Sequence, residues 1–415
     1  MKINYKIREF PVILFLILLL YIIIIFIFAK SEIKGDEVGY STYAENITKG
    51  FYAGGNDINI WWGPGYPLFL AALKILHLPV IIIKLFNAVF FFIAVLLFYK
   101  TLLFFTDEKK AQAFSFILGL WPPYIREMVI QNSEALSSLL ICLLLYLSVL
   151  IFRKNEFKFK YYLITGIVIG YLALTKVIFG YVILANIIIL IIAFPFFKNR
   201  FFIKSSLLIF IISLIFCVPY LIYTYNLTGK VFFWTNGGGT NLYHSATPFT
   251  GEYGDWMGNN VFDDNEQARI NHKKMLEETK DMKMVGKDEM LKKMGIENLK
   301  NHPVKFVYNW FCGIGRLMFN YPYSYSYQKL DTYFFILPNI FLFIFLFFSI
   351  GIFIRHRNLF PRELSFIVLL SVVYFGGISV VAAVARYTAI FYPLFFIIIL
   401  FVFTRIVKIQ KIESL

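Results

Sequence analysis

Two adjacent acidic residues, Asp36 and Glu37, follow a hydrophobic run that carries no charge from Pro11 to Ala29. Neighbouring carboxylates repel one another, and they repel more strongly beside a low-dielectric surface than in bulk water. The pair is therefore either solvated beyond the end of a helix or required by chemistry at that surface. In the second case it would supply a general base that activates a hydroxyl or amine acceptor.

Three positively charged residues stand between hydrophobic runs: Lys176 in "LALTKVIFG", Arg386 in "AAVARYTAI" and Arg126 in "PPYIREMV". Polar groups near membrane depth are costly, so each one raises a functional question. Isolated Lys and Arg suit a phosphate group, which Arg grips with two hydrogen bonds. Structural alternatives remain open. Lys176 could extend to the membrane interface, and Arg386 could belong to a buried ion pair. Arg126 could simply neutralise Glu127.

The composition indicates a multi-spanning membrane protein. Of the 415 residues, 59% are hydrophobic and only 16% are charged, and the mean hydropathy is +0.69. The formal charge of +15 does not indicate nucleic acid, because Lys and Arg occur mostly in short tracts between hydrophobic runs. We therefore expect membrane lipids as partners and no nucleic acid. The three cysteines fit neither a disulfide framework nor a zinc site.

Hydrophobic runs of about 17–25 residues predict roughly ten membrane-spanning helices. They lie at 10–29, 79–104, 112–130, 133–152, 161–176, 178–197, 203–225, 332–354, 362–384 and 387–405. If Lys2, Lys6 and Arg8 keep the N-terminus cytoplasmic, the basic connections all fall on the cytoplasmic side. Both termini are then cytoplasmic, and the long connections 30–78 and 226–331 are exoplasmic. The predicted fold class is an all-α polytopic bundle with short interfacial helices in its exoplasmic loops.

Three regions follow from this topology: an N-terminal transmembrane module (1–225), a second exoplasmic loop region (226–331) and C-terminal transmembrane helices (332–415). In the first loop, about 30–78, the stretch "WWGPGYPLFLAALKIL" predicts a turn and a short interfacial helix. In the second loop, apolar residues at helical spacing predict a partly helical segment. These residues are Met275, Leu276, Met290, Leu291 and Met294.

The same topology brings the acidic pair, the three cations and Glu134 to the exoplasmic face. A carboxylate beside phosphate-binding cations fits group transfer from a lipid-linked phosphate donor to an aqueous acceptor. Three alternatives remain. A transporter or flippase for lipid-linked sugars would string its charges through the bilayer, and a polymerase or ligase would move whole glycans from a lipid pyrophosphate. A non-catalytic scaffold or sensor would not need Asp36.

Several stretches, in chain order, resemble the polytopic glycosyltransferases with the GT-C fold. They are "GDEVGYSTYAENITKGFY", "PGYPLFLAAL", "IREMVIQNSEALSSLLICLLLYL", "GIVIGYLALTK", "TYNLTGKVFFWTNGGGTNLYHSATPFTGEY" and "RYTAIFYPLFF". The likeness is to the branch of dolichyl-phosphate-mannose protein mannosyltransferases and lipid A aminoarabinose transferases, family 39-like. This chain is shorter than the best-known members and lacks a large C-terminal soluble domain, which leaves the acceptor open.

The resemblance implies that a monosaccharide moves from a polyprenyl-phosphate donor, undecaprenyl or dolichyl, to a glycan, lipid or protein acceptor. The reaction would be an inverting single displacement. By the matching motifs, Asp36 is the catalytic carboxylate with Glu37 beside it, and Lys176 binds the donor phosphate. The cations Arg386 and Arg126 are further phosphate-binding candidates. Residues expected to orient substrate are Glu134, Tyr40, Asn236, Gly238, Asn241 and His244.

Other interpretations of the second loop are less specific. The run Gly237–Gly239 could form an anion-binding nest or only a flexible turn. A divalent metal could bind His244 near Asp255, but no ligand spacing such as HExxH supports it, so neither a metal nor a cofactor is predicted. Abundant Lys, Ile, Phe and Asn favour a low-GC bacterial host, and hence the bacterial inner or plasma membrane.

Overall fold

The computed structural model describes residues 11–54, 57–154, 157–196, 200–326, 330–356 and 360–406. Within these ranges all regular structure is helical. The predicted orientation depends on Lys2, Lys6 and Arg8, which lie outside the described residues together with the basic tract after Ile406.

The hydrophobic runs fold into apolar helices. Within the described residues, five helices are long and apolar enough to cross a membrane. These are α4 (Val80–Leu102), α7 (Glu134–Lys154), α10 (Arg200–Thr228), α17 (Asp331–Arg355) and α18 (Ser365–Val381, preceded by η4, Arg362–Leu364). Shorter apolar helices are α1 (Phe15–Phe28, after η1, Val12–Leu14), α3 (Gly65–Ile75), α8 (Phe159–Thr175), α9 (Ile178–Ala193) and α20 (Tyr392–Phe401, continued by η5, Val402–Ile406). The predicted number of ten spans is not confirmed by these lengths.

The third predicted span, 112–130, is wrong as a single helix. The structure has α5 (Glu108–Gly119), then α6 (Pro122–Arg126) and a 3-10 turn η2 (Glu127–Val129). Trp121 precedes two prolines and is extended, with ψ 118°. A residue before proline is pushed out of the helical region, and proline itself provides no N–H group, so the helix ends there. The break leaves irregular backbone at residues 130–133, next to Glu134.

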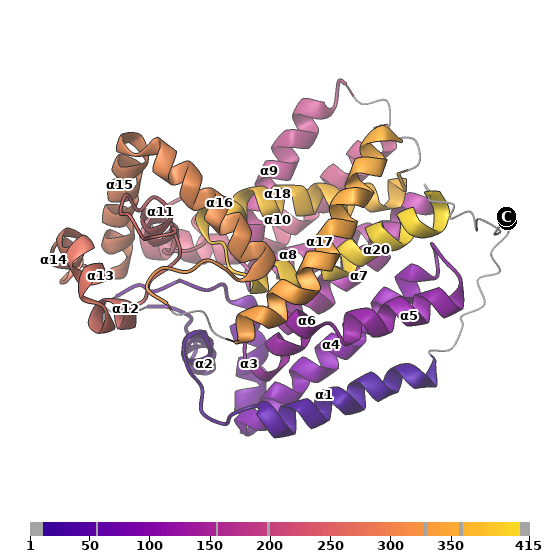
Figure 1. The fold of residues 1–415 in the computed structure, drawn as a ribbon, viewed down its shortest axis with the longest axis horizontal. Helices are drawn as coiled ribbons and strands as arrows, with labels where there is room; N and C mark the ends of the chain where they lie inside the picture. The colour runs from indigo at the N-terminus through magenta and orange to yellow at the C-terminus, as the bar shows by residue number, and fades with distance from the viewer. Residues whose placement is uncertain are drawn as a thin grey trace, which may run out of the picture.

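The long helices pack side by side into a bundle, with α4 against α7, α8 against α10, α9 against α18 and α17 against α20 (Figure 1). Large aromatic side chains fill the interior, among them Phe91, Phe98, Tyr99 and Tyr374. The outward-facing side chains of these helices are apolar as well: Phe26, Ile192, Ile215 and Phe341 are all exposed. An apolar core inside an apolar exterior is the arrangement of an integral membrane protein.

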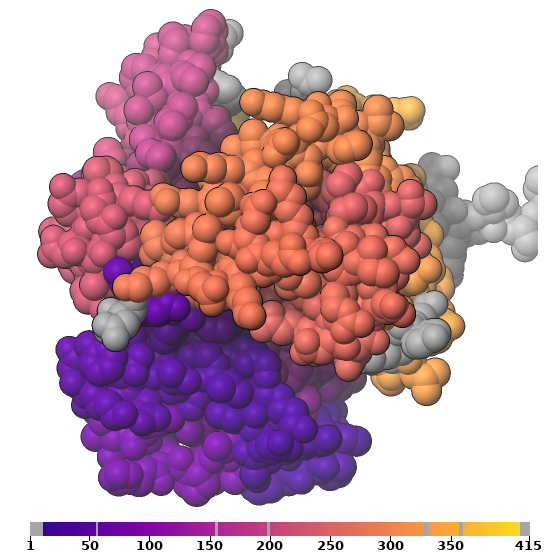
Figure 2. All heavy atoms as spheres, turned by 90° about the vertical axis from the view of Figure 1, so that its left-hand side faces the viewer, coloured from indigo at the N-terminus to yellow at the C-terminus, as the bar shows by residue number. Residues whose placement is uncertain are grey.

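The connections predicted to be long loops gather at one end of the bundle, on the left in Figure 1, which we call the loop face. The first connection contains α2 (Asp36–Thr48) and α3. The second contains α11 (Gly238–Ser245), α12 (Asn259–Asp264), α13 (Glu266–Asn271), α14 (Lys273–Thr279), α15 (Met284–Asn301) and α16 (Pro303–Phe319). Figure 2 looks onto this face and shows the two connections lying against each other.

The helical prediction for the second connection is confirmed. Met275 and Leu291 are buried in a small core separate from that of the bundle, together with Tyr243 and Phe262. The second connection therefore has its own hydrophobic interior, to which each of the helices α11 to α15 contributes.

Candidate active site

Asp36 is the first residue of α2, at the point where the chain turns away from α1. Gly35 before it has φ 57°, a left-handed conformation that glycine adopts without a steric penalty. The carboxylate of Asp36 accepts a hydrogen bond from Nη2 of Arg386, 350 residues later in the chain.

Arg386, Glu134 and Lys176 continue this contact into the protein. Oε1 of Glu134 lies 2.9 Å from Nζ of Lys176 and 3.5 Å from Nε of Arg386. Lys176 Nζ also lies 4.9 Å from the centre of the Tyr387 ring. We call Asp36, Glu134, Lys176 and Arg386 the charge cluster. Its members are each at a helix end: the starts of α2, α7 and α19 (Arg386–Ala389), and the residue after α8.

The charge cluster has an accessible half and a buried half. The side chains of Asp36 and Arg386 are 29% and 22% exposed, whereas those of Glu134 and Lys176 are 3% and 7% exposed. Within the described part of the chain, Arg386 Nε, Glu134 Oε2 and the Thr388 hydroxyl make no hydrogen bond. Buried polar groups are nearly always paired, so these three atoms leave the charge cluster with unused hydrogen-bonding capacity for a polar ligand.

Tyr40 lies one turn along α2 from Asp36, and its hydroxyl is 3.2 Å from that of Ser133. Burial raises the pKa of Tyr40 well above its usual value, and the negative charges of Glu134 and Asp36 add to this effect. The phenol therefore stays protonated beside the charge cluster.

Glu37 points away from Asp36, into a buried ion pair that the sequence analysis missed. Its Oε1 lies 2.9 Å from Nζ of Lys84 and accepts the backbone N–H of Gln131 at 2.7 Å. The backbone N–H of Lys34 reaches its Oε2 at 3.1 Å. This carboxylate is thus engaged on both oxygens, unlike that of Asp36. The missed signal was Lys84 itself, a lone cation in the apolar stretch "VIIIKLFNAV".

Two polar residues of α4 hold the backbone around the charge cluster. Lys84 Nζ also donates to the carbonyl of Lys30, 2.9 Å away, in the link that leads to α2. Asn87, three residues further along α4, donates from Nδ2 to the carbonyls of Met128 and Ile130 at 3.0 and 2.8 Å. Those carbonyls lie in η2 and in the irregular backbone after it, which leads to Glu134, so α4 is bonded to the segments that precede both acidic helix starts.

Arg126, predicted to bind donor phosphate, is paired with a neighbouring carboxylate. Its Nη1 donates to Glu127 Oε1 at 2.8 Å, and its guanidinium lies 5.3 Å from the centre of the Phe335 ring. The pairing with Glu127 corresponds to the structural alternative raised from the sequence. Glu127 is 1% exposed, so Arg126 supplies the counter-charge of a buried carboxylate.

Three residues predicted to orient substrate lie where the two loop connections join or where α11 begins. Asn236 is buried, and its Oδ1 accepts the backbone N–H of Ile60 at 3.1 Å. Gly238 is the first residue of α11, and Asn241 donates its backbone N–H to Gly237, which caps that helix.

The triple glycine forms this helix start rather than a flexible turn. The carboxylate of Asp288 accepts the backbone N–H of Thr240 at 3.0 Å, so an internal anion occupies the helix N-terminus. A Cβ on Gly239 would lie 1.8 Å from the carbonyl oxygen of Asp288, so glycine is required for α11 to approach α15 this closely.

His244 is buried in the small core of the second connection. Burial, together with the nearby His272, lowers the pKa of His244 to about 3, so its ring is neutral. Asp255 does not approach it as a metal ligand; its carboxylate accepts the backbone N–H of Ser324 at 3.0 Å. In the described ranges, no group of three His, Cys, Asp or Glu side chains is arranged to hold a metal ion.

A network around Glu252 links the parts of the second connection. Oε1 of Glu252 accepts from the Tyr325 hydroxyl at 2.6 Å and from Asn271 Nδ2 at 2.9 Å. Oε2 accepts from the Thr247 hydroxyl and lies 3.1 Å from Nε2 of His272. Burial alone would raise the pKa of Glu252, but these hydrogen bonds and the charge of His272 lower it to about 2.

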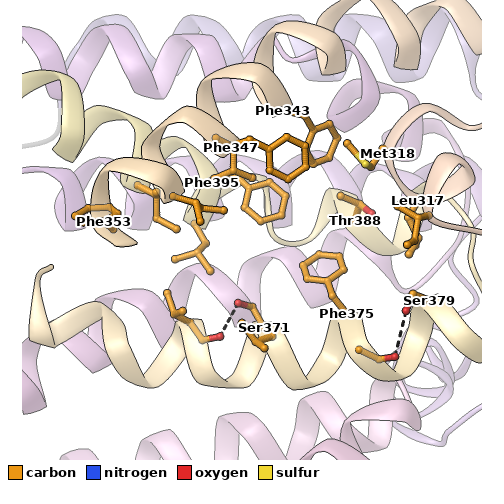
Figure 3. A pocket seen from close by; sticks show the side chains of 18 of the residues that line it. Leu317, Met318, Phe343, Phe347, Phe353, Ser371, Phe375, Ser379, Thr388 and Phe395 are labelled. Atoms are coloured by element: carbon orange, nitrogen blue, oxygen red, sulfur yellow. Dashed lines mark hydrogen bonds between the residues drawn. The ribbon is translucent and has the colours of Figure 1, made fainter. Parts of the chain in front are cut away.

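A cavity of about 800 Å³ lies between α17 and α18, with α16 and α20 closing it on other sides (Figure 3). Its walls are almost entirely apolar, and the hydroxyls of Ser371 and Ser379 bond back to their own helix. Thr388, two residues after Arg386, lines the cavity. Phe347 and Val372 line it and are exposed, so the cavity is open along one side.

Comparisons with known proteins agree with this architecture. A family model described as dolichyl-phosphate-mannose-protein mannosyltransferase matches residues 64–223, which confirms the family resemblance over that range. A search of the curated proteins finds no match.

Two solved structures are similar along most of this chain. The archaeal oligosaccharyltransferase AglB from Archaeoglobus fulgidus, in complex with an inhibitory peptide and a dolichol-phosphate, covers 94% of it at 12% identity, with a TM-score of 0.49. The crystal structure of the Archaeoglobus fulgidus oligosaccharyltransferase in complex with Zn and sulfate covers 93% at 12% identity, with a TM-score of 0.51. This chain spans about half of those proteins, 50% and 48%. The second likeness confirms the predicted fold, an all-α bundle of the GT-C type.

Proposed function

We propose that this integral membrane protein is a glycosyltransferase that moves a monosaccharide from a polyprenyl-phosphate donor to an acceptor on the exoplasmic side. The charge cluster is the observation that carries the proposal: a partly exposed carboxylate, Asp36, contacts a partly exposed guanidinium, Arg386, at the loop face. Support also comes from the family match over residues 64–223.

In the proposed reaction the donor phosphate binds the guanidinium of Arg386 in place of Asp36. The carboxylate of Asp36 is thereby freed. The oxygen or nitrogen of the acceptor then attacks the anomeric carbon, while Asp36 accepts the proton of that hydroxyl or amine group. The bond between that carbon and the phosphate oxygen breaks, and polyprenyl phosphate leaves with the electron pair. This single displacement inverts the anomeric centre and needs no nucleophile from the protein.

Lys176 and Glu134 act behind this pair. Lys176 is 7% exposed and forms an ion pair with Glu134. We therefore assign to its positive charge the role of stabilising the leaving phosphate from the buried side of the site. Glu134 holds both cations in place through one oxygen. Glu37, locked to Lys84, is proposed to fix the start of α2 rather than to accept a proton. Arg126 forms an ion pair with Glu127, and we do not include it in the proposed phosphate site.

The apolar cavity suits the lipid tail of such a donor. It runs beside α17 from Phe343 to Ile354, about 16 Å at 1.5 Å per residue. The hydroxyl groups that line the cavity donate to backbone carbonyls, apart from that of Thr388 beside the charge cluster. The rest of the cavity therefore suits a hydrocarbon chain. A polyprenyl chain lying there would bring its phosphate to α19, where Arg386 begins the helix.

The test is an incubation of the purified protein with a panel of polyprenyl-phosphate monosaccharides, polyprenyl-pyrophosphate glycans and candidate acceptors, followed by mass spectrometry. We expect consumption of one monosaccharide donor, release of polyprenyl phosphate and a gain of one sugar mass by an acceptor. The Asp36→Asn variant should consume none.

Two other outcomes would replace the proposal. Release of a polyprenyl pyrophosphate with transfer of a whole glycan would identify a ligase. Movement of a lipid-linked sugar across liposome membranes without covalent change would identify a flippase.

A further inference from the structure

The four residues that lead into Arg386 have no helix of their own. Helix α18 ends at Val381, and α19 begins at Arg386. Downstream, the Tyr374 hydroxyl donates to the carbonyl of Tyr387 at 3.1 Å. Upstream, two carbonyls are held by side chains of the second connection. The Ser245 hydroxyl donates to Val381 at 3.1 Å, and Nε of Arg316 donates to Ala383 at 3.2 Å.

Arg316 is built into this contact at a considerable cost. It is 1% exposed, and desolvating a guanidinium is unfavourable unless its donors find partners. Besides Ala383, its Nη1 donates to the carbonyls of Tyr253 at 2.8 Å and Pro322 at 3.1 Å. One side chain therefore joins three separate stretches of backbone, two from the second connection and one from the link before Arg386.

The fit around Arg316 leaves little room for an alternative arrangement. A Cβ on Gly313, one turn before Arg316 on α16, would lie 3.1 Å from the carbonyl of Ser379 and 3.2 Å from Cβ of Ala383. Helix α16 therefore approaches the end of α18 closely enough for its residues to fix the course of the link.

We propose that Arg316 is a positioning residue that fixes the guanidinium of Arg386, and so couples the second connection to the donor-phosphate site. Arg386 is three residues beyond Ala383 and meets both Asp36 and Glu134. A displacement of about 1 Å in such a group can cost about a hundredfold in rate, so the link must be held firmly. The inference rests on the proposed function, since it assigns Arg386 to the donor phosphate.

The test is a double-mutant cycle on the affinity of the full-length, detergent-solubilised protein for undecaprenyl phosphate. Arg316→Lys keeps the charge but loses the planar guanidinium whose Nε and Nη1 reach the three carbonyls. Arg386→Ala removes the proposed phosphate ligand. We expect Arg316→Lys to weaken binding about tenfold in the wild-type background and less than twofold in the Arg386→Ala background, because contacting or coupled residues are not additive. The rate of hydrogen exchange at the backbone amides of residues 382–388 should rise in the Arg316→Lys single variant.

Two further variants guard the interpretation. Ser245→Ala removes the milder of the two tethers and should show the same dependence on Arg386 with a two- to threefold effect, even if Arg316→Lys does not fold. Lys230→Met is the matched control, because the ion pair of Lys230 with Glu289 of α15 lies within the second connection. Its effect on affinity should be the same in both backgrounds.

Equal factors for Arg316→Lys in the two backgrounds, or no effect in either, overturn the positioning role and leave the proposed function standing. If Arg386→Ala itself binds undecaprenyl phosphate as tightly as the wild type, the phosphate site of the proposed function is wrong and the coupling falls with it.

Discussion

Glu134 and Glu252 are both buried carboxylates at the loop face, yet their surroundings differ. Both oxygens of Glu252 are engaged, by hydroxyls, an amide and an imidazole. Glu134 shares one oxygen between two cations, while its other oxygen makes no hydrogen bond within the described residues. The first arrangement has no capacity left for a ligand, and the second has.

The difference separates a network that stabilises from one that can react. Glu252 ties residues 247, 271, 272 and 325 into the small core of the second connection, where every partner comes from the protein. The charge cluster joins four helix ends and has an accessible edge, formed by Asp36 and Arg386. A fully satisfied polar network fixes one structure, whereas a partly satisfied one is expected where a substrate completes it.

The largest effect should come from the accessible edge of the charge cluster. Asp36→Asn removes the proposed base, so transfer should slow about a thousandfold. Affinity for undecaprenyl phosphate and thermal stability should change little. The assay is the initial rate of acceptor labelling. Asp57→Asn is the matched control, since Asp57 lies in the same connection and accepts a hydrogen bond from the backbone of Met284. Normal transfer by Asp36→Asn would refute the assignment of the base.

Breaking the satisfied network should affect stability rather than rate. Glu252→Gln replaces a charged acceptor in a buried site, at a cost of about 2 kcal/mol. Thermal unfolding in detergent should occur at a lower temperature, while transfer per folded molecule stays normal. If Glu252→Gln slows transfer without lowering the unfolding temperature, the Glu252 network takes part in the reaction and is not only stabilising.

The same variant predicts a pH dependence. The pKa of Glu252 in the folded protein, about 2, lies below its usual value of 4.5. Its stabilisation is therefore fully present above about pH 4.5 and is lost as the pH falls towards 2. The difference in unfolding temperature between wild type and Glu252→Gln should be constant from pH 7 to 5 and narrow below that. A difference that widens on acidification would contradict the assignment.

A smaller effect is expected from the buried half of the charge cluster. Lys176→Ala should weaken undecaprenyl phosphate binding and slow transfer, each about tenfold, because a charge near the phosphate is lost. Lys176→Arg should restore most of both, since the positive charge remains. The readouts are a binding isotherm and initial rates. Equal losses in the Ala and Arg variants would indicate that packing against Tyr387, not charge, is what matters.

The smallest effect should come from the join between the two connections. Asn236→Ala removes the acceptor for the backbone N–H of Ile60 and should cost about 1 kcal/mol of stability. Donor affinity should be unchanged, because Asn236 lies in this join rather than in the charge cluster. A donor affinity that falls more than tenfold would return Asn236 to the substrate-orienting role expected from the sequence.

Several features could be predicted because an isolated charge in apolar sequence is costly. Lys176 and Arg386 stood out for this reason, and the structure places both beside Glu134. The helical spacing of Met275 and Leu291 likewise predicted buried helix faces correctly. Their chemical roles stay predictions, since geometry alone assigns no reaction.

Other features depended on partners that are distant in the chain. The triple glycine reads as a turn or nest until Asp288, about 50 residues later, is seen to occupy its helix N-terminus. Similarly, Glu37 resembles a second catalytic acid until Lys84 is found against it. The broken third span was predictable from Trp121 and the two prolines after it, but a hydropathy window averages over such a break.

The two polar residues of α4 have a consequence for the behaviour of this protein in different bilayers. Lys84 and Asn87 lie within one turn of the same helix and hold the approaches to Asp36 and to Glu134 respectively. Helix α4 has 23 residues, about 34 Å, which exceeds a typical hydrocarbon thickness of about 30 Å, so it is long enough to span a membrane with some tilt. Because the two residues lie within one turn of this helix, we expect the two acidic helix starts to move together when its tilt changes. We therefore expect the distance between Asp36 and Glu134 to depend little on lipid composition.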